Sequence, residues 1–312
     1  MRYLRIAILS FGLCSCELNT ATLTEPDSLL VAEIYVQISD QSPRGNVVAF
    51  IHNTLGTAGN VQLAGTDITL TSRGQSVRLT EFSDAKECLD VVALNNVSGA
   101  CFKEDQLPLG FVIPGSVIEA NVDAGDLGNL TGKTTIPGDF YFRVPGSETD
   151  RCFLESSRAL EIEWTSSMGA WAYVGETLIF GLPQALEVLN IDSEIESPLL
   201  LLGLSISSTD TTMVFPSEFG IFDRYSLDRE VSVLLQDGIP ENTWAEVFIS
   251  AADRNYVNWV RESSFSPSGT ARIPSLYGEG GTGVIASYIR RGFTLVTVRP
   301  SAEDSLVPCS GG

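Results

Sequence analysis

Apolar and polar residues alternate one by one along several stretches of this chain, and this pattern constrains its fold more than any other feature. Every second residue is apolar in the segments 67–71, 76–80, 116–123 and 160–164. Successive side chains of a β-strand point to opposite faces, so the alternation places one set in a core and the other toward solvent. It predicts antiparallel strands with one solvated face, and therefore a mostly β fold.

The chain divides into two predicted β-domains. A polar stretch with proline and glycine at 145–150 is typical of a linker, which gives domains at residues 29–146 and 155–309. Trp164 is predicted to pack in the centre of the second core, as an inward Trp does in immunoglobulin- and fibronectin-like modules. We therefore predict two tandem β-sandwiches, immunoglobulin/fibronectin-like or transthyretin-like, with one or two short helices in the second.

Two segments of the second domain indicate those helices. Residues 183–190 can form one or two helical turns. Asp253 is a residue type that caps helix N-termini, and Tyr256, Val257 and Val260 follow at a spacing that puts them on one helix face.

Other segments of the second domain indicate strands. The leucine run 199–202 is predicted to be a strand buried on both faces, and 229–235 a further strand. Residues 290–292 (Arg-Arg-Gly) are predicted to turn the chain between the strands 284–289 and 294–298 of a closing hairpin.

Residues 1–15 are predicted to be a signal peptide. Two arginines precede the apolar segment 6–13, which is far shorter than the ~20 residues that span a membrane. Residues 13–16 (Leu-Cys-Ser-Cys) resemble the lipobox of bacterial lipoprotein precursors, which implies cleavage before Cys16 and its acylation. An ordinary secretory signal is the alternative. Residues 16–28 are polar and are predicted to form a flexible tether between lipid and fold.

Four further cysteines indicate two disulfides, because an even number in an exported chain is typical of a disulfide framework. Three pairings are possible; we favour Cys88 with Cys101, closing a local loop, and Cys152 with Cys309, tying the start of the second domain to its end. Zinc is the competing interpretation, but the chain has no Cys-x-x-Cys pair and its single histidine is His52.

The charge of the chain argues against nucleic acid as a partner. Its 39 Asp and Glu outnumber its 19 Lys and Arg, for a formal net charge of −20. Such a chain is repelled by phosphates and by anionic lipid headgroups. We therefore expect contact with a membrane to come through the lipid on Cys16 rather than through a basic surface.

Three motifs look like ligand sites and are explained better as structure. Residues 278–283 match G-x-G-x-x-G, but a strand pattern follows where a dinucleotide site needs a helix, so we predict a loop in which glycine lets the backbone turn or approach a neighbour. Residues 132–134 (Gly-Lys-Thr) lack the first glycine and the helix of a phosphate-binding loop. Residues 123–129 could offer oxygens to calcium, but lack EF-hand spacing and are predicted to be a turn.

No catalytic residue can be nominated from the sequence. His52 stands among apolar residues and is predicted to be structural, and no G-x-S-x-G or H-E-x-x-H motif occurs. A glycosidase could use two carboxylates alone, but the sequence does not single out a pair. We predict no cofactor and no metal.

Several segments together resemble a family of bacterial lipoproteins of unknown function that are associated with TonB-dependent outer-membrane transport. The segments are the acylated Cys16 and residues 30–38, 64–70, 114–115, 134–137, 253–259 and 278–283. The resemblance implies an outer-membrane location, on the periplasmic face or the cell surface, and an envelope protein such as a transporter as partner. It carries over no catalytic residue.

Two functional hypotheses follow. The first is a lipid-anchored binding or assembly protein of the cell envelope, without catalytic activity and accessory to an outer-membrane transporter. The second is an envelope carbohydrate-active hydrolase that uses paired carboxylates.

Overall fold

The structure is a computed structural model, and it describes residues 29–54, 63, 65–82, 88, 99–147, 149–192, 194–220, 227–259, 273–297 and 306–309, together with the backbone of residues 260–265. The predicted signal peptide, the acylated Cys16 and the tether all lie in residues 1–28, outside the described residues.

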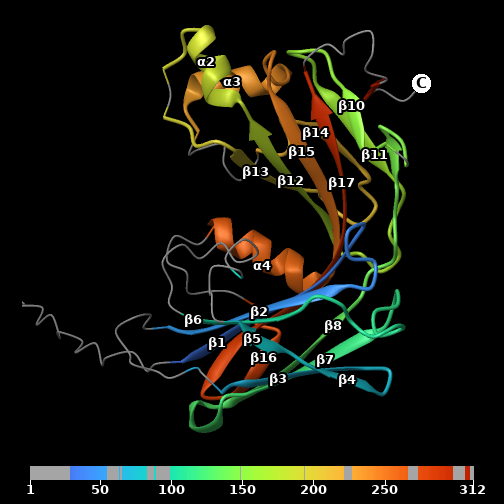
Figure 1. Cartoon of the computed structure of the whole chain (residues 1–312), viewed down its shortest axis with the longest axis vertical. Helices are drawn as coiled ribbons and strands as arrows, with labels where there is room; N and C mark the ends of the chain where they lie inside the picture. The colour runs from blue at the N-terminus through green and yellow to red at the C-terminus, as the bar shows by residue number, and fades with distance from the viewer. Residues whose placement is uncertain are drawn as a thin grey trace, which may run out of the picture.

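Strands dominate the structure, which confirms the predicted mostly β, sandwich-like class. Two lobes can be distinguished (Figure 1). The N-lobe contains β1 to β8, β16 and the first part of β17. Its strands are β1 (Leu30–Ser39), β2 (Asn46–Asn53), β3 (Asp67–Ser72), β4 (Gln75–Arg78), β5 (Thr80–Phe82), β6 (Gly99–Glu104), β7 (Val117–Asp123), β8 (Asn129–Thr135) and β16 (Leu276–Glu279).

The C-lobe contains β9 to β15, β18 and the last part of β17. Its strands are β9 (Phe142–Val144), β10 (Arg151–Phe153), β11 (Leu160–Trp164), β12 (Ala172–Phe180), β13 (Leu199–Leu204), β14 (Thr212–Phe215), β15 (Trp244–Ala252) and β18 (Val307–Pro308). Strands β14, β11 and β9 form a separate three-stranded sheet, and the others belong to one large mixed sheet that runs through both lobes.

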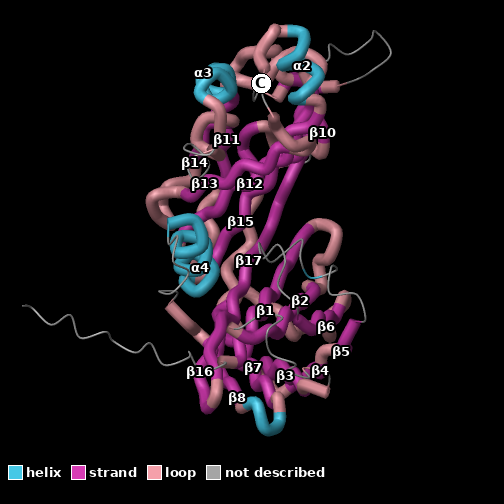
Figure 2. Tube along the Cα trace, turned by 90° about the vertical axis from the view of Figure 1, so that its left-hand side faces the viewer, coloured by secondary structure: helices cyan, strands magenta, loops and turns pink. Residues whose placement is uncertain are grey.

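The strand β17 (Gly281–Val296) connects the two lobes without a break. Its residues 281–290 pair in parallel with β1, and its residues 288–296 pair antiparallel with β15. Because these two registers overlap at 288–290, β1 and β15 lie on opposite edges of β17. One strand therefore belongs to the sheets of both lobes, and Figure 2 shows it running along the length of the molecule.

This continuous strand corrects the predicted closing hairpin and differs from the predicted domain division. Residues 290–292, interpreted as a turn, lie inside β17. Arg290 is neutralised by Glu176, and Arg291 by Asp40 and Asp139, so both arginines can remain within a strand. Residues 276–290, assigned to the second domain, pair with β8 and β1 of the first.

The larger of two apolar clusters runs through both lobes. In the N-lobe the sheet folds over itself, so that Ile34 and Ala49 of one layer face Ile68 and Val122 of the other. In the C-lobe the three-stranded sheet packs on β12, β13 and β15, with Trp164 1% exposed, as predicted. A second cluster, which includes Tyr35, Phe50 and Tyr288, lies on the concave face and packs against the helix α4.

Three α-helices are described, all in the second half of the chain: α2 (Leu182–Val188), α3 (Arg229–Asp237) and α4 (Arg254–Phe265). Helix α2 matches the turns predicted at 183–190. Helix α4 is capped by Asp253, whose Oδ1 accepts from the Tyr256 backbone N–H at 2.9 Å, and Val257 is buried as predicted. The side chain of Val260 lies outside the described residues.

Two predictions for the C-lobe were wrong. The predicted strand at 229–235 is helix α3, because Asp228 caps its first turn and Val231 and Leu235, four residues apart, enter the core on one face. The strand at 199–202 is buried on one face rather than both, since Leu201 is buried whereas Leu200 is 47% exposed.

Both predicted disulfides are present, Cys88 with Cys101 and Cys152 with Cys309. The first closes a separation of 13 residues and the second one of 157. Two disulfides in one chain are typical of exported proteins. Within the described part of the chain, no helix is both long enough and apolar enough to cross a membrane.

Candidate functional site

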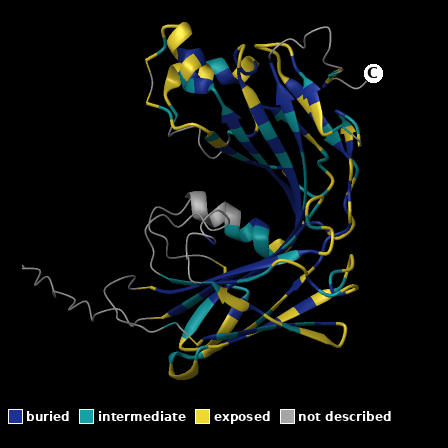
Figure 3. Ribbon diagram, viewed as in Figure 1, coloured by how far each residue is buried: buried dark blue, intermediate teal, exposed yellow. Residues whose placement is uncertain are grey.

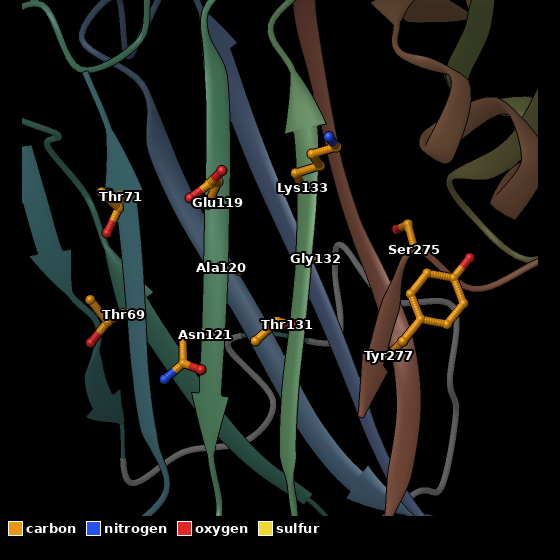
Figure 4. Close-up of a pocket in the computed structure, with 10 residues that line it drawn as sticks. All are labelled: Thr69, Thr71, Glu119, Ala120, Asn121, Thr131, Gly132, Lys133, Ser275 and Tyr277. Atoms are coloured by element: carbon orange, nitrogen blue, oxygen red, sulfur yellow. The ribbon is translucent and has the colours of Figure 1, made fainter. Parts of the chain in front are cut away.

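A groove of about 520 Å³ lies on the outer face of the N-lobe, across strands β3, β7, β8 and β16 (Figure 4). We call this surface the polar face. It is formed by alternate residues of four neighbouring strands, and its side chains are Thr69, Thr71, Glu119, Asn121, Thr131, Lys133, Ser275 and Tyr277.

The alternation of the sequence positions these side chains. Ile68, Val122 and Leu130 point into the core and are buried, so their neighbours along each strand point outward. Figure 3 shows exposed and buried residues alternating along the outer strands of the N-lobe. The apolar residues thus hold the strands in register while the polar ones remain free to contact a ligand.

Cross-strand pairing arranges the polar face in two rows. Asn121 lies opposite Thr69 on one side and Thr131 on the other, and Thr131 lies opposite Tyr277. In the second row, Glu119 lies between Thr71 and Lys133. Because neighbouring strands are about 4.8 Å apart, four strands place side chains across about 14 Å.

The central side chains of the polar face make no bonds to one another. Among the described residues, none forms a side-chain hydrogen bond or ion pair with Glu119, Asn121, Thr131 or Lys133, although Glu119 and Lys133 occupy opposed positions. In Figure 4 both charged side chains lie at one end of the groove. These groups can therefore bind a ligand without first breaking an internal bond.

The side chains at the β16 edge of the groove, unlike the central ones, are held by hydrogen bonds. The Ser275 hydroxyl accepts from the Ile285 N–H at 2.8 Å and donates to the Ile285 carbonyl at 3.0 Å. Tyr277 is 57% exposed, and its hydroxyl donates to the Pro274 carbonyl. The hydroxyl bond holds the ring in one orientation, although most of the ring surface faces solvent.

Glycines allow the strands at the β16 edge of the groove to form. These glycines belong to residues 278–283, the segment that matches G-x-G-x-x-G. Residues 278–283 form the tight β16–β17 hairpin rather than a loop. A Cβ on Gly283 would lie 1.9 Å from the Ala32 carbonyl, and one on Gly278 would lie 1.7 Å from the Asn129 carbonyl. The glycines therefore serve the close approach of strands, and Gly280, with φ +79°, turns the chain in the hairpin, so both roles we predicted for them are present.

A buried polar cluster lies on the other face of β8. The Thr134 hydroxyl donates to Asp253 Oδ2 at 2.6 Å and lies 2.8 Å from the Ser287 hydroxyl, which donates to the Thr135 carbonyl. Burial raises the pKa of Asp253 from 3.8 to about 6, against the opposing effect of its hydrogen bonds. This cluster joins β8, β17 and the start of α4 directly behind the polar face.

The remaining motifs noted in the sequence either lie away from the polar face or belong to its strands and turns. His52 is buried on β2, with its Nε2 3.5 Å from Glu33 Oε1, and Tyr35 donates to the same carboxylate. Residues 132–134 are part of β8, and residues 123–129 form the β7–β8 turn. The described residues contain no group of three or more potential metal ligands.

The polar face was not predicted from the sequence. Its residues are common ones and come from segments up to about two hundred positions apart. The available signals were the outward positions of the alternating segments at 67–71 and 116–123, and the aromatic Tyr277 beside the glycine-rich stretch.

The fold and the groove define a class of protein: a disulfide-bonded, mostly β protein with an open polar sheet face. No family model matches the chain. No curated protein matches it either. Among the matching solved structures are the fibronectin(III)-like modules of CbhA from Clostridium thermocellum, with 6% identity, 87% of this chain and 99% of that chain covered, and a TM-score of 0.19. A likeness of this size carries no argument about function.

Proposed function

We propose that this protein is an exported binding protein of the bacterial cell envelope, anchored by a lipid on Cys16, and that it binds its ligand through the polar face. The observation that carries the proposal is that, among the described residues, no side chain bonds to Glu119, Asn121, Thr131 or Lys133 on this exposed sheet. The two disulfides and the lipobox resemblance support export. An outer-membrane transporter is the neighbour that the family resemblance implies.

The groove favours binding over hydrolysis. A glycosidase mechanism requires two carboxylates on opposite sides of the bond that is cleaved. Among the described residues that line the groove, Glu119 alone has a carboxylate. The proposed role is therefore non-catalytic.

The anchor can be tested with two neighbouring cysteines. Cys16→Ser should abolish acylation and move the protein from the detergent phase to the aqueous phase of a phase-partition assay. Cys14→Ser should leave the partition unchanged, because residue 14 lies in the part removed by cleavage. Equal partition of both variants with the native protein would contradict lipid attachment at Cys16.

Binding through the polar face can be tested once the lipid no longer holds the protein at the envelope. In the Cys16→Ser background, we expect part of the protein to sediment with isolated envelopes. Thr131→Arg places a long side chain across the centre of the groove and should lower this retention roughly tenfold, which corresponds to about 1.4 kcal/mol.

Thr135→Arg is the matched control, because Thr135 is exposed on the same strand but does not line the groove. It should retain binding. Absence of retention in the Cys16→Ser background, or equal losses for Thr131→Arg and Thr135→Arg, would count against a binding role for the polar face.

A further inference from the structure

The charges of the polar face indicate what kind of ligand it accepts. Among the described residues that line the groove, Glu119 and Lys133 are the two that are charged, and their charges cancel. A strongly anionic ligand would meet Glu119 and a chain of net charge −20, and a strongly cationic one would meet Lys133. The groove is therefore suited to a ligand without net charge.

The hydrogen-bonding groups of the polar face suit a ligand rich in hydroxyls. Asn121 offers both donors and an acceptor, Lys133 only donors and Glu119 only acceptors. A sugar hydroxyl both donates and accepts, so it can bond to each of these groups. Thr69 and Thr131 add hydroxyls on either side of Asn121 in the same row.

Tyr277 supplies an apolar surface at the end of that row. Tyr277 is more than half exposed, and its ring is held by the hydroxyl bond to Pro274. A fixed, exposed aromatic ring can stack against the C–H face of a sugar at little cost in side-chain entropy. Hydrogen-bonding side chains beside one such ring form a surface for a pyranose.

The rows also indicate the shape of the ligand. Side chains recur about every 4.8 Å across four strands, a distance of about 14 Å, and the polar face is an open sheet surface rather than an enclosed cavity. Such a surface fits an extended chain that lies across the strands.

From these observations we propose that the polar face binds a neutral, linear glycan, with Tyr277 stacking on one sugar and Asn121, Glu119 and Lys133 bonding to hydroxyls of the next ones. This inference rests on the proposed function, since it names the class of ligand for the same surface.

Isothermal titration of the purified full-length protein with oligosaccharides tests the inference. The probes are cellohexaose, xylohexaose, maltohexaose and chitohexaose, with oligogalacturonate as an anionic probe and hexalysine as a cationic one. We expect at least one neutral hexamer to bind. Its Kd should change less than about twofold between about 0.05 and about 0.5 M salt, because screening has little effect on a neutral ligand.

Side-chain variants locate the binding. Tyr277→Ala should weaken it by roughly tenfold or more, and Asn121→Ala by about tenfold, because a stacked ring and a polar partner are lost. Tyr141→Ala is the matched control, since Tyr141 is also 57% exposed but lies outside the groove. It should change the Kd less than about twofold.

The outcomes separate this inference from the proposed function. Failure of every neutral hexamer to bind would overturn the glycan assignment, and so would binding of oligogalacturonate or hexalysine alone. If Thr131→Arg still lowers envelope retention in that case, the polar face is a binding surface for another class of ligand. Equal losses in Tyr277→Ala and Tyr141→Ala would place glycan binding elsewhere on the molecule.

Discussion

The two lobes share the strand β17, but each lobe is stabilised by different interactions. The N-lobe disulfide, Cys88 with Cys101, closes a short loop, and the outer sheet of this lobe leaves its polar face open. The C-lobe disulfide joins residues 157 positions apart, and helices α2 and α3 bury apolar residues at its far end. The disulfide of the lobe that presents the candidate binding surface is thus local, whereas the disulfide of the other lobe joins residues far apart in the sequence.

The largest expected effect comes from removing the disulfides. Cys152→Ser/Cys309→Ser should lower the free energy of unfolding by up to about 5 kcal/mol, and Cys88→Ser/Cys101→Ser by up to about 3 kcal/mol, because the longer loop gains more entropy when it opens. Denaturant unfolding followed by tryptophan fluorescence measures both, since Trp164 and Trp244 belong to the C-lobe and the ring of Trp259 contacts Tyr35 of the N-lobe. Equal, small losses in the two variants would contradict this difference between the lobes.

The next largest effect concerns Asp253, which joins α4 to the N-lobe sheet. Its pKa is raised from 3.8 to about 6, so the folded state binds its proton more tightly than the unfolded state does. The resulting stabilisation is complete below pH ~4 and is lost as the pH rises to about 6, a change of about 3 kcal/mol.

Asp253→Asn removes this titration while it keeps an acceptor for the Tyr256 N–H. Relative to the native protein, the Asn variant should gain about 3 kcal/mol between pH ~4 and pH ~7 in urea unfolding. Thr134→Val removes a hydrogen bond that lowers the pKa of Asp253, so it should move the window to higher pH. Parallel pH profiles for the native protein and Asp253→Asn would refute the role of this carboxyl group.

The smallest expected effect comes from Arg290 and Arg291, whose side chains lie on opposite faces of β17 where this strand passes between the lobes. Arg290 bonds to Glu176 at 2.7 Å and stacks over Phe248 at 3.8 Å, and the pair is about three-quarters buried. Arg291 bonds to Asp40 and Asp139, whose side chains are 63% and 64% exposed. Arg290→Met should therefore cost about 1–2 kcal/mol and Arg291→Met less than about 1 kcal/mol.

A double-mutant cycle with Glu176→Gln tests the Arg290 pair. We expect a coupling energy of about 1 kcal/mol between positions 176 and 290 and none between 176 and 291. A larger cost for Arg291→Met than for Arg290→Met would show that the face that bonds to Asp40 and Asp139 controls the connection between the lobes.

Local patterns allowed much of the fold to be predicted from the sequence. The alternation at 67–71 and 160–164 predicted strands that are present, and the cap at Asp253 predicted α4. Even the disulfide pairing followed from the positions of the cysteines along the chain. The patterns that determine these strands and this helix lie within a few residues of one another. The disulfide pairing is limited to three combinations of four cysteines.

The predicted turn at 290–292 was wrong because the structure of these residues depends on distant partners. The pair Arg290 and Arg291 has the composition of a turn, and only acids far away in the sequence make it part of a strand. Helix α3 had a local signal, Asp228 followed by Val231 and Leu235, but the alternation of Val231 and Val233 resembled a strand. The polar face requires the register of four strands, which the sequence does not specify.

The position of β1 has a mechanical consequence. This strand begins at Leu30, follows the segment that leads to Cys16, and is bonded along its length to β2 on one side and β17 on the other. A pull along the strand axis from the N-terminal end of β1 would load both rows of hydrogen bonds in shear, so that they share the force rather than break one after another. Strand β1 is therefore placed to bear tension.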